Sequence, residues 1–172
     1  MRVVYLLVFS LLLGSCGTNQ KTAQTKKTEV LNFNCPPNGD CVFEVLKNSS
    51  LLIKYDDFGK LYPEIVPGNK LVIKYHYKKD EIENTVDGSY SEFVYLEIDE
   101  NDKQIILKDE ELQKVKMLFG RICFCRDAMG YFKVTEGSLF IFNNDRKLLI
   151  NSKFKVKKVP QIITEINENI NY

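Results

Sequence analysis

"KLVIKYHYKK", residues 70–79, is the stretch that decides the fold class of this 172-residue chain. In an extended conformation one face carries apolar and aromatic side chains: Leu71, Ile73, Tyr75 and Tyr77. The other face is mostly polar: Val72, Lys74, His76 and Lys78. This period of two predicts a β-strand with one buried face and one solvated face.

Further short stretches, rich in Val, Ile, Phe and Tyr and bounded by turn residues, also predict strands. They are CVFEVL (41–46), SLLIKY (50–55), SEFVYLEI (91–98), KQIILK (103–108), YFKV (131–134), SLFIF (138–142), KLLI (147–150) and KFKV (153–156). We therefore predict one mainly β domain over residues 31–172, an antiparallel β-sandwich or barrel.

Two segments have helical spacing instead. Residues 109–119 begin with three acidic side chains and carry lysines toward the end, which predicts one short helix that begins at Asp109. After Pro160, the tail places Ile163, Ile166 and Ile170 on one helical stripe. That stripe predicts a C-terminal helix, which would cover an open end of the sheet or, alternatively, bind a partner.

The chain begins MRVVYLLVFSLLLGSC, with one basic residue and an apolar run too short to span a bilayer. Leu13-Gly14-Ser15-Cys16 resembles the lipobox of bacterial lipoproteins. The resemblance implies that residues 1–15 are a signal peptide, that Cys16 is lipidated with diacylglycerol and a fatty acid such as palmitate, and that the mature protein is anchored to a membrane. Several acyl chains give stable anchoring.

Residues 16–30 are small and polar after Cys16, which predicts a flexible tether. Gly17 is not the aspartate that retains enteric lipoproteins at the inner membrane, so the resemblance implies the outer membrane, with the periplasmic or outer side left open. Without residues 1–15 the chain has 23 basic and 23 acidic side chains. This balance argues against a nucleic-acid partner.

Four cysteines remain besides Cys16: Cys35, Cys41, Cys123 and Cys125. Exported thiols tend to be oxidised. If Cys123 and Cys125 lie on one strand, their Cα atoms are about 6.6 Å apart and their side chains run parallel, which disfavours a bond between them. We therefore favour two disulfides that join Cys35 and Cys41 to Cys123 and Cys125, each worth about 4 kcal/mol because it closes a long loop.

Two other arrangements of these cysteines remain open. A four-cysteine zinc site usually has ligand pairs two to four residues apart, whereas the gaps here are one and five residues, so we expect no metal. The other arrangement is a local Cys35–Cys41 bond beside a redox-active Cys123/Cys125 pair, where Arg121 and Arg126 could lower a thiol pKa.

Other candidates for chemistry are sparse. His76 is the only histidine and lies between two lysines, so we assign no catalytic residue. Asp99, Asn101 and Glu110 fit positions 1, 3 and 12 of a calcium loop, but Lys103 occupies a ligand position. A hairpin turn is the better interpretation. No phosphate-binding or dinucleotide-binding motif is present, and we expect no cofactor.

Nine tyrosines and eleven phenylalanines are the remaining signal, and an exposed group of them would form a binding face for sugars, peptides or lipids. The leading hypothesis is a lipid-anchored, non-catalytic binding or structural module that acts on an envelope protein or a cell-wall component. One alternative is a barrel that carries a small lipid-like ligand. Another is an enzyme that uses thiols or carboxylates.

Overall fold

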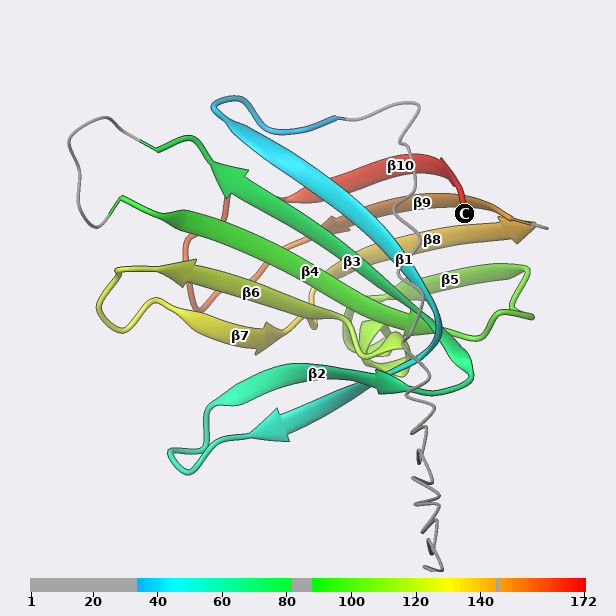
Figure 1. The fold of residues 1–172 in the computed structure, drawn as a ribbon, viewed down its shortest axis with the longest axis horizontal. Helices are drawn as coiled ribbons and strands as arrows, with labels where there is room; N and C mark the ends of the chain where they lie inside the picture. The colour runs from blue at the N-terminus through cyan, green and yellow to red at the C-terminus, as the bar shows by residue number, and fades with distance from the viewer. Residues whose placement is uncertain (1–33, 82–87, 145) are drawn as a thin grey trace, which may run out of the picture.

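The computed structural model describes residues 34–81, 88–144 and 146–172. The predicted signal peptide (1–15), the lipid acceptor Cys16 and the tether (16–30) lie outside these residues. Two antiparallel sheets form the fold, as predicted (Figure 1). One sheet has six strands in the order β2-β1-β3-β4-β6-β7, and the other has four in the order β10-β9-β8-β5.

The six-stranded sheet contains β1 (Gly39–Tyr55), β2 (Leu61–Pro67), β3 (Lys70–Lys79), β4 (Tyr90–Ile98), β6 (Leu118–Cys123) and β7 (Gly130–Lys133). The four-stranded sheet contains β5 (Gln104–Lys108), β8 (Gly137–Asn144), β9 (Lys147–Phe154) and β10 (Glu165–Asn171). A 3-10 helix of seven residues, η1 (Asp109–Val115), joins β5 to β6.

The main core fills the space between the two sheets. Leu71, Ile73 and Tyr75 of β3 face it, as their period of two predicts, and inward side chains of β8 and β9 such as Ile141 and Ile150 oppose them. All five are almost completely buried. Burial of apolar surface on this scale is the dominant driving force for folding.

Strand β1 bends in the middle and carries the six-stranded sheet into a curl. Its first part pairs with β3 up to Leu46, and its second part pairs with β2 from Ser49 onward. One extra residue is inserted between these two positions, where Asn48 adopts a left-handed conformation with φ of 52°. A bulge of this kind bends a strand and exchanges its faces. As a result Val45 faces the main core, whereas Leu51 faces the opposite side of the sheet.

A second, small core therefore lies under the curl. Leu51, Val72, Tyr95 and Leu118 are its buried members, and Ile53, Leu61, Ile65 and Tyr131 are among the partly buried side chains around it. The face of β3 predicted to be solvated is thus covered at Val72 by the β1–β2 hairpin.

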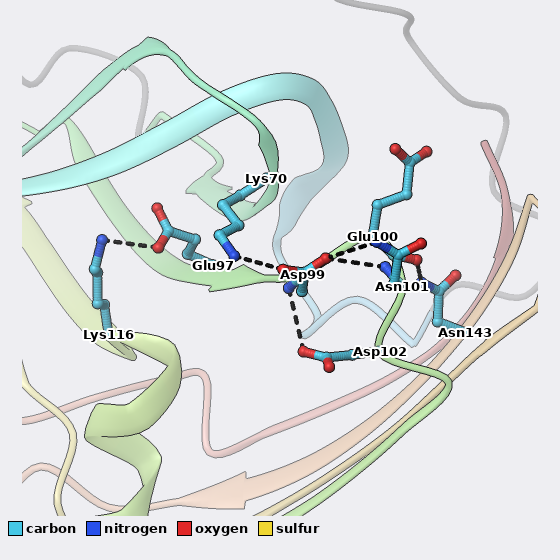
Figure 2. Close-up of polar contacts among 8 residues, drawn as sticks. All are labelled: Lys70, Glu97, Asp99, Glu100, Asn101, Asp102, Lys116 and Asn143. Atoms are coloured by element: carbon cyan, nitrogen blue, oxygen red, sulfur yellow. Dashed lines mark hydrogen bonds and ion pairs between the residues drawn. The ribbon is translucent and has the colours of Figure 1, made fainter.

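A charged pair fixes this bend. The carboxylate of Glu97 lies 2.8 Å from the ammonium of Lys116 (Figure 2). It also accepts a hydrogen bond of 2.6 Å from the backbone N–H of Leu51. Lys116 also donates to the carbonyl of Leu51 at 2.8 Å. The two side chains satisfy backbone groups that lost their strand partner when β1 left β3.

Both predicted helices require correction. The first helix exists, but it is a 3-10 helix that ends at Val115, and its N-cap is Lys108 instead of Asp109. The carboxylate of Asp109 accepts the N–H of Gly137 instead of capping the helix. The C-terminal helix is wrong, because residues 165–171 form strand β10. Ile166, Glu168 and Ile170 alternate inward there, and the buried carboxyl of Glu168 hid this period of two.

The segment from Asp99 to Asp102 is a turn, as expected, but it does not close a hairpin. It leads from β4 in one sheet to β5 in the other. The Asp99 carboxylate accepts the N–H of Asn101 at 3.1 Å, and Lys70 donates to it at 2.5 Å. Figure 2 shows these contacts, with the Asn143 side chain donating to the Glu100 carbonyl at 3.0 Å.

Candidate ligand-binding groove

The β1–β2 and β6–β7 turns project at one end of the molecule (Figure 1). An open groove of about 1010 Å³ lies there. Its walls come from three segments that are far apart in the sequence: the β1–β2 turn, the β6–β7 turn together with β7, and the loop that follows β9. A groove of this size exceeds most small-molecule pockets. It suits an extended ligand.

Basic side chains dominate the lining of this groove. They are Lys60, Arg126, Lys133, Lys155, Lys157 and Lys158, against the acidic side chains Asp127 and Glu136. Lys157 forms an ion pair with Glu136. Within the described parts of the chain the other five cations form no ion pair. The groove is therefore strongly cationic although the charges of the chain as a whole are nearly balanced.

The loop after β9 is held in place by polar contacts. Gln161 accepts the N–H of Val156 at 2.6 Å and donates to the carbonyl of Ile163 at 2.7 Å. The carboxylate of Glu92, which is fully buried, accepts the N–H groups of Ile162 and Ile163, both at 2.7 Å. Val156 is buried between the exposed lysines, so the loop has an inner and an outer side. The lysines of the groove thus stand on an ordered support.

The β1–β2 turn is ordered as well. The carboxylate of Asp56 accepts the N–H groups of Phe58 at 2.9 Å and Lys60 at 2.7 Å. Gly59 occupies the left-handed region with φ of 72°, which glycine adopts without strain. The turn holds Phe58 at its tip, 88% exposed, and Tyr55 at the groove wall, 59% exposed.

Aromatic rings also line the inner part of the groove. Tyr131 lies over Gly120 of the neighbouring strand, where a Cβ atom would come within 2.5 Å of the ring. Its ring packs edge-on against Tyr95, with centroids 6.2 Å apart. Glycine at position 120 therefore allows Tyr131 to lie flat on the sheet, beside Tyr55 and the cations. Aromatic rings and cations thus line the same groove.

The four cysteines form disulfides, but the favoured connectivity is wrong. The bonds are Cys35–Cys41 and Cys123–Cys125. Strand β6 ends at Cys123 and the chain bends at Phe124, so the two Cα atoms are 5.2 Å apart instead of the spacing of an extended strand. The loops contain seven and three residues. In the chain-entropy model they contribute about 2.4 and about 1.6 kcal/mol, well below the value expected for long loops.

His76 lies on the outer face of the six-stranded sheet and does not meet a carboxylate pair. Its ring stacks on Phe93 with centroids 4.2 Å apart. Burial and the neighbouring Lys74 lower the pKa of His76, and its Nε2 atom has no hydrogen-bond partner among the described residues. Lys74 itself pairs with Glu44 at 2.8 Å. The imidazole is therefore neutral and serves packing.

The described residues contain no group of three or more His, Cys, Asp or Glu side chains that could hold a metal ion. Nor does any helix in the described ranges have the length and apolar character needed to cross a membrane. Comparisons of the chain with protein-family models, with curated proteins and with solved structures found no match.

Sequence reasoning did not find the groove. Its lysines at positions 155, 157 and 158 were interpreted in part as the end of a strand, KFKV, whose charged residues would face solvent. Tyr55 and Phe58 are two of the twenty tyrosines and phenylalanines, and the sequence does not single them out as exposed. The one usable signal was the run KVKK after a strand, because three lysines in four residues are hard to neutralise locally.

Proposed function

We propose that this protein is a non-catalytic lipoprotein of the cell envelope, anchored through Cys16 to the outer membrane, whose groove binds an acidic glycan. The observation that carries the binding proposal is the set of five unpaired cations beside exposed aromatic rings in one groove. Carboxylate or phosphate groups of such a polymer would meet Lys155, Lys158 and Lys133. Tyr55 and Tyr131 would pack against sugar rings.

The shape of the groove supports a polymer over a compact ligand. The groove is open, and it continues along the loop after β9, where a second hollow is lined by residues 154–161. The alternative of a barrel with a lipid-like cargo needs a cavity in its interior, between the two sheets. Buried side chains of the main core, such as Ile73, Ile141 and Ile150, occupy that space.

Binding can be tested with an oligogalacturonate, which carries one carboxylate per sugar, and a neutral dextran oligosaccharide of equal length. We expect the oligogalacturonate to bind and its affinity to fall at least tenfold between 50 and 300 mM salt, because salt screens exposed charges. The neutral sugar should bind weakly or not at all. Equal affinity for both sugars would contradict the proposal.

The anchor requires a separate test, the intact mass of the protein extracted from native membranes. We expect the mass of residues 16–172 increased by acyl chains, and release of a Cys16→Ser variant into the soluble fraction. A full-length chain without acyl groups, or membrane retention of the variant, would contradict the anchor while leaving the groove proposal intact.

A further inference from the structure

The Cys123–Cys125 disulfide lies in an accessible position at the rim of the groove. Cys125 lines the groove and also a smaller hollow on the other side of the turn, formed with residues of the β3–β4 region such as Asp80 and Tyr90. Phe124, the residue between the two cysteines, is 82% exposed. Cys123 is 7% exposed and lines only the smaller hollow. Cys125, which is half-buried, is therefore the more accessible cysteine of the pair.

This bond contributes little to the fold. It joins residues two apart in sequence, and the backbone of β6 is already held by its pairing with β4 and β7. Thermodynamic linkage makes two free energies equal. One is the free energy by which the disulfide stabilises the fold, and the other is the free energy by which the fold disfavours reduction of the disulfide. A bond that closes a three-residue loop therefore receives little protection. Exposed and weakly protected disulfides are the ones that take part in exchange.

The second disulfide of the chain lies in different surroundings. Cys35 and Cys41 pack against the main core, and the Tyr75 hydroxyl lies 3.1 Å from the Cys41 sulfur as a donor. The loop that this bond closes is also longer. Cys35 and Cys41 are both half-buried, and Cys35 lines a hollow of its own, so the two bonds differ in loop length and in neighbouring charge and not in exposure. Cys35–Cys41 therefore serves as a reference bond within the same chain.

Cations next to the Cys123–Cys125 bond favour its opening. Arg121 precedes Cys123 by two residues on β6 and so projects from the same face of the strand. Its guanidinium donates to the Tyr90 hydroxyl at 3.2 Å and the Ala128 carbonyl at 2.5 Å, and it forms no ion pair among the described residues. Arg126 follows Cys125 directly. Positive charge beside a cysteine stabilises its thiolate and makes it a better leaving group.

We propose that Cys123–Cys125 is an exchangeable disulfide that accepts two electrons from a dithiol in a partner polypeptide. A partner thiolate attacks the sulfur of Cys125, the bond between the two cysteines breaks, and Cys123 leaves as a thiolate. The second partner thiolate then attacks the mixed disulfide and releases Cys125. The partner gains a disulfide, and Cys123 and Cys125 become a dithiol after taking up two protons.

A polypeptide fits this site better than a small thiol. Phe124 projects from the middle of the disulfide loop, and the exposed Met129 lies at the other end of the same turn. Apolar side chains on both sides of a reactive bond provide contact area for a chain that passes over it, whereas a small thiol needs none. The groove cations lie alongside.

The first test needs no variant. The intact protein is equilibrated with mixtures of reduced and oxidised dithiothreitol, quenched with acid, alkylated and mapped by peptide mass spectrometry. We expect the equilibrium constant for reduction of Cys123–Cys125 to be about tenfold larger than that of Cys35–Cys41. Equal constants, or earlier reduction of Cys35–Cys41, would overturn the proposal.

The second test identifies the attacked sulfur and the partner class with a synthetic reduced peptide that contains two cysteines. A Cys123→Ser variant, activated at Cys125 as a mixed disulfide with 2-nitro-5-thiobenzoate, should react with the peptide at least tenfold faster than the matching Cys125→Ser variant activated at Cys123. In a protein that keeps both cysteines, Phe124→Ala should slow reduction by the peptide but not by dithiothreitol. Equal rates at the two sulfurs would contradict attack at Cys125, and an unchanged rate with Phe124→Ala would contradict a polypeptide partner.

Discussion

Charged side chains in two regions of this molecule differ in whether they form ion pairs. Three lysines are paired with acids near the Asp99–Asp102 turn and the start of β6: Lys70 lies 2.5 Å from Asp99, Lys116 lies 2.8 Å from Glu97, and Lys47 lies 3.8 Å from Glu100. At the groove end five cations stand without an ion-pair partner among the described residues. The chain has acids enough to pair them, so their isolation is a local property of this end.

The difference separates structural charge from charge that is free to bind. The paired charges fix chain segments: Glu97 and Lys116 hold the bend of β1, and Asp99 with Lys70 orders the turn between the sheets. Two of the unpaired cations, Lys155 and Lys158, stand on the loop after β9, which Gln161 and Glu92 hold in place. Removing a paired charge should therefore change stability, and removing an unpaired one should change binding.

The largest effect on the free energy of unfolding is expected at a buried carboxyl group that forms no ion pair among the described residues. Glu168 lies on the inward face of β10, 1% exposed, and one carboxyl oxygen has no partner in the part of the chain that the structure describes. Burial raises its pKa to about 7, although the N–H of Asn34 partly opposes this. The unfolded chain loses this proton near the usual value of 4.5, so stability falls as the pH rises from about 4.5 to about 7.

A Glu168→Gln variant should abolish this loss. At pH 8 it should be more stable than the unaltered protein by as much as about 3 kcal/mol, and at pH 5 the two should differ little. Urea unfolding at both pH values measures the difference. An equal effect of the substitution at pH 5 and pH 8 would show that the carboxyl titrates normally.

The second largest effect on stability is expected at the ion pair between Glu97 and Lys116. A Glu97→Ala variant leaves the Leu51 N–H and the Lys116 ammonium without their acceptor, and we expect a loss of about 2 to 3 kcal/mol in the free energy of unfolding. Hydrogen exchange should become faster in β2 and in the second half of β1. A stable variant with unchanged exchange would mean that the charged pair does not hold the bend.

A smaller effect is expected at the edge of the same region. Lys70 and Asp99 are partly exposed to solvent, and exposed ion pairs contribute little. Lys70→Met should lower the midpoint of thermal unfolding less than Glu97→Ala does. A loss as large as that of Glu97→Ala would show that the Asp99 turn, and not the bend of β1, is the main site of charge stabilisation.

The smallest effect on stability is expected at the groove. Lys155→Ala and Lys158→Ala remove exposed charges that stabilise no segment, so the free energy of unfolding should change by no more than about 0.5 kcal/mol. Chemical denaturation of each variant checks this. A gain in stability would agree with the contrast between paired and unpaired charges, because crowded cations repel each other. A loss above about 1 kcal/mol would instead assign these lysines a structural role.

Several strands could be predicted from the sequence because their alternation is clean. In β3, β8 and β9 the inward residues are apolar almost without interruption, and the structure confirms all three. Strand β2 was missed because Pro63 and Pro67 argue against a strand, yet β2 lies at the edge of the sheet, where proline is tolerated.

Other features depend on contacts that a single sequence does not display. The stretches 41–46 and 50–55 were recognised as strands, but only the bulge near Asn48 makes them one bent strand with exchanged faces. The Cys123–Cys125 disulfide depends on the bend at Phe124, which the assumption of a straight strand excluded. The groove joins three distant segments, so neither its charge nor its rings could be assembled beforehand.

The most direct test of the binding proposal compares two single charge reversals by titration calorimetry with the oligogalacturonate. Lys158→Glu changes an exposed lysine of the groove, and Lys147→Glu changes an exposed lysine at the start of β9, outside the groove lining. We predict that Lys158→Glu weakens binding about tenfold and Lys147→Glu less than twofold, both with unchanged folding. Equal losses for the two variants, or no loss for Lys158→Glu, would contradict the account.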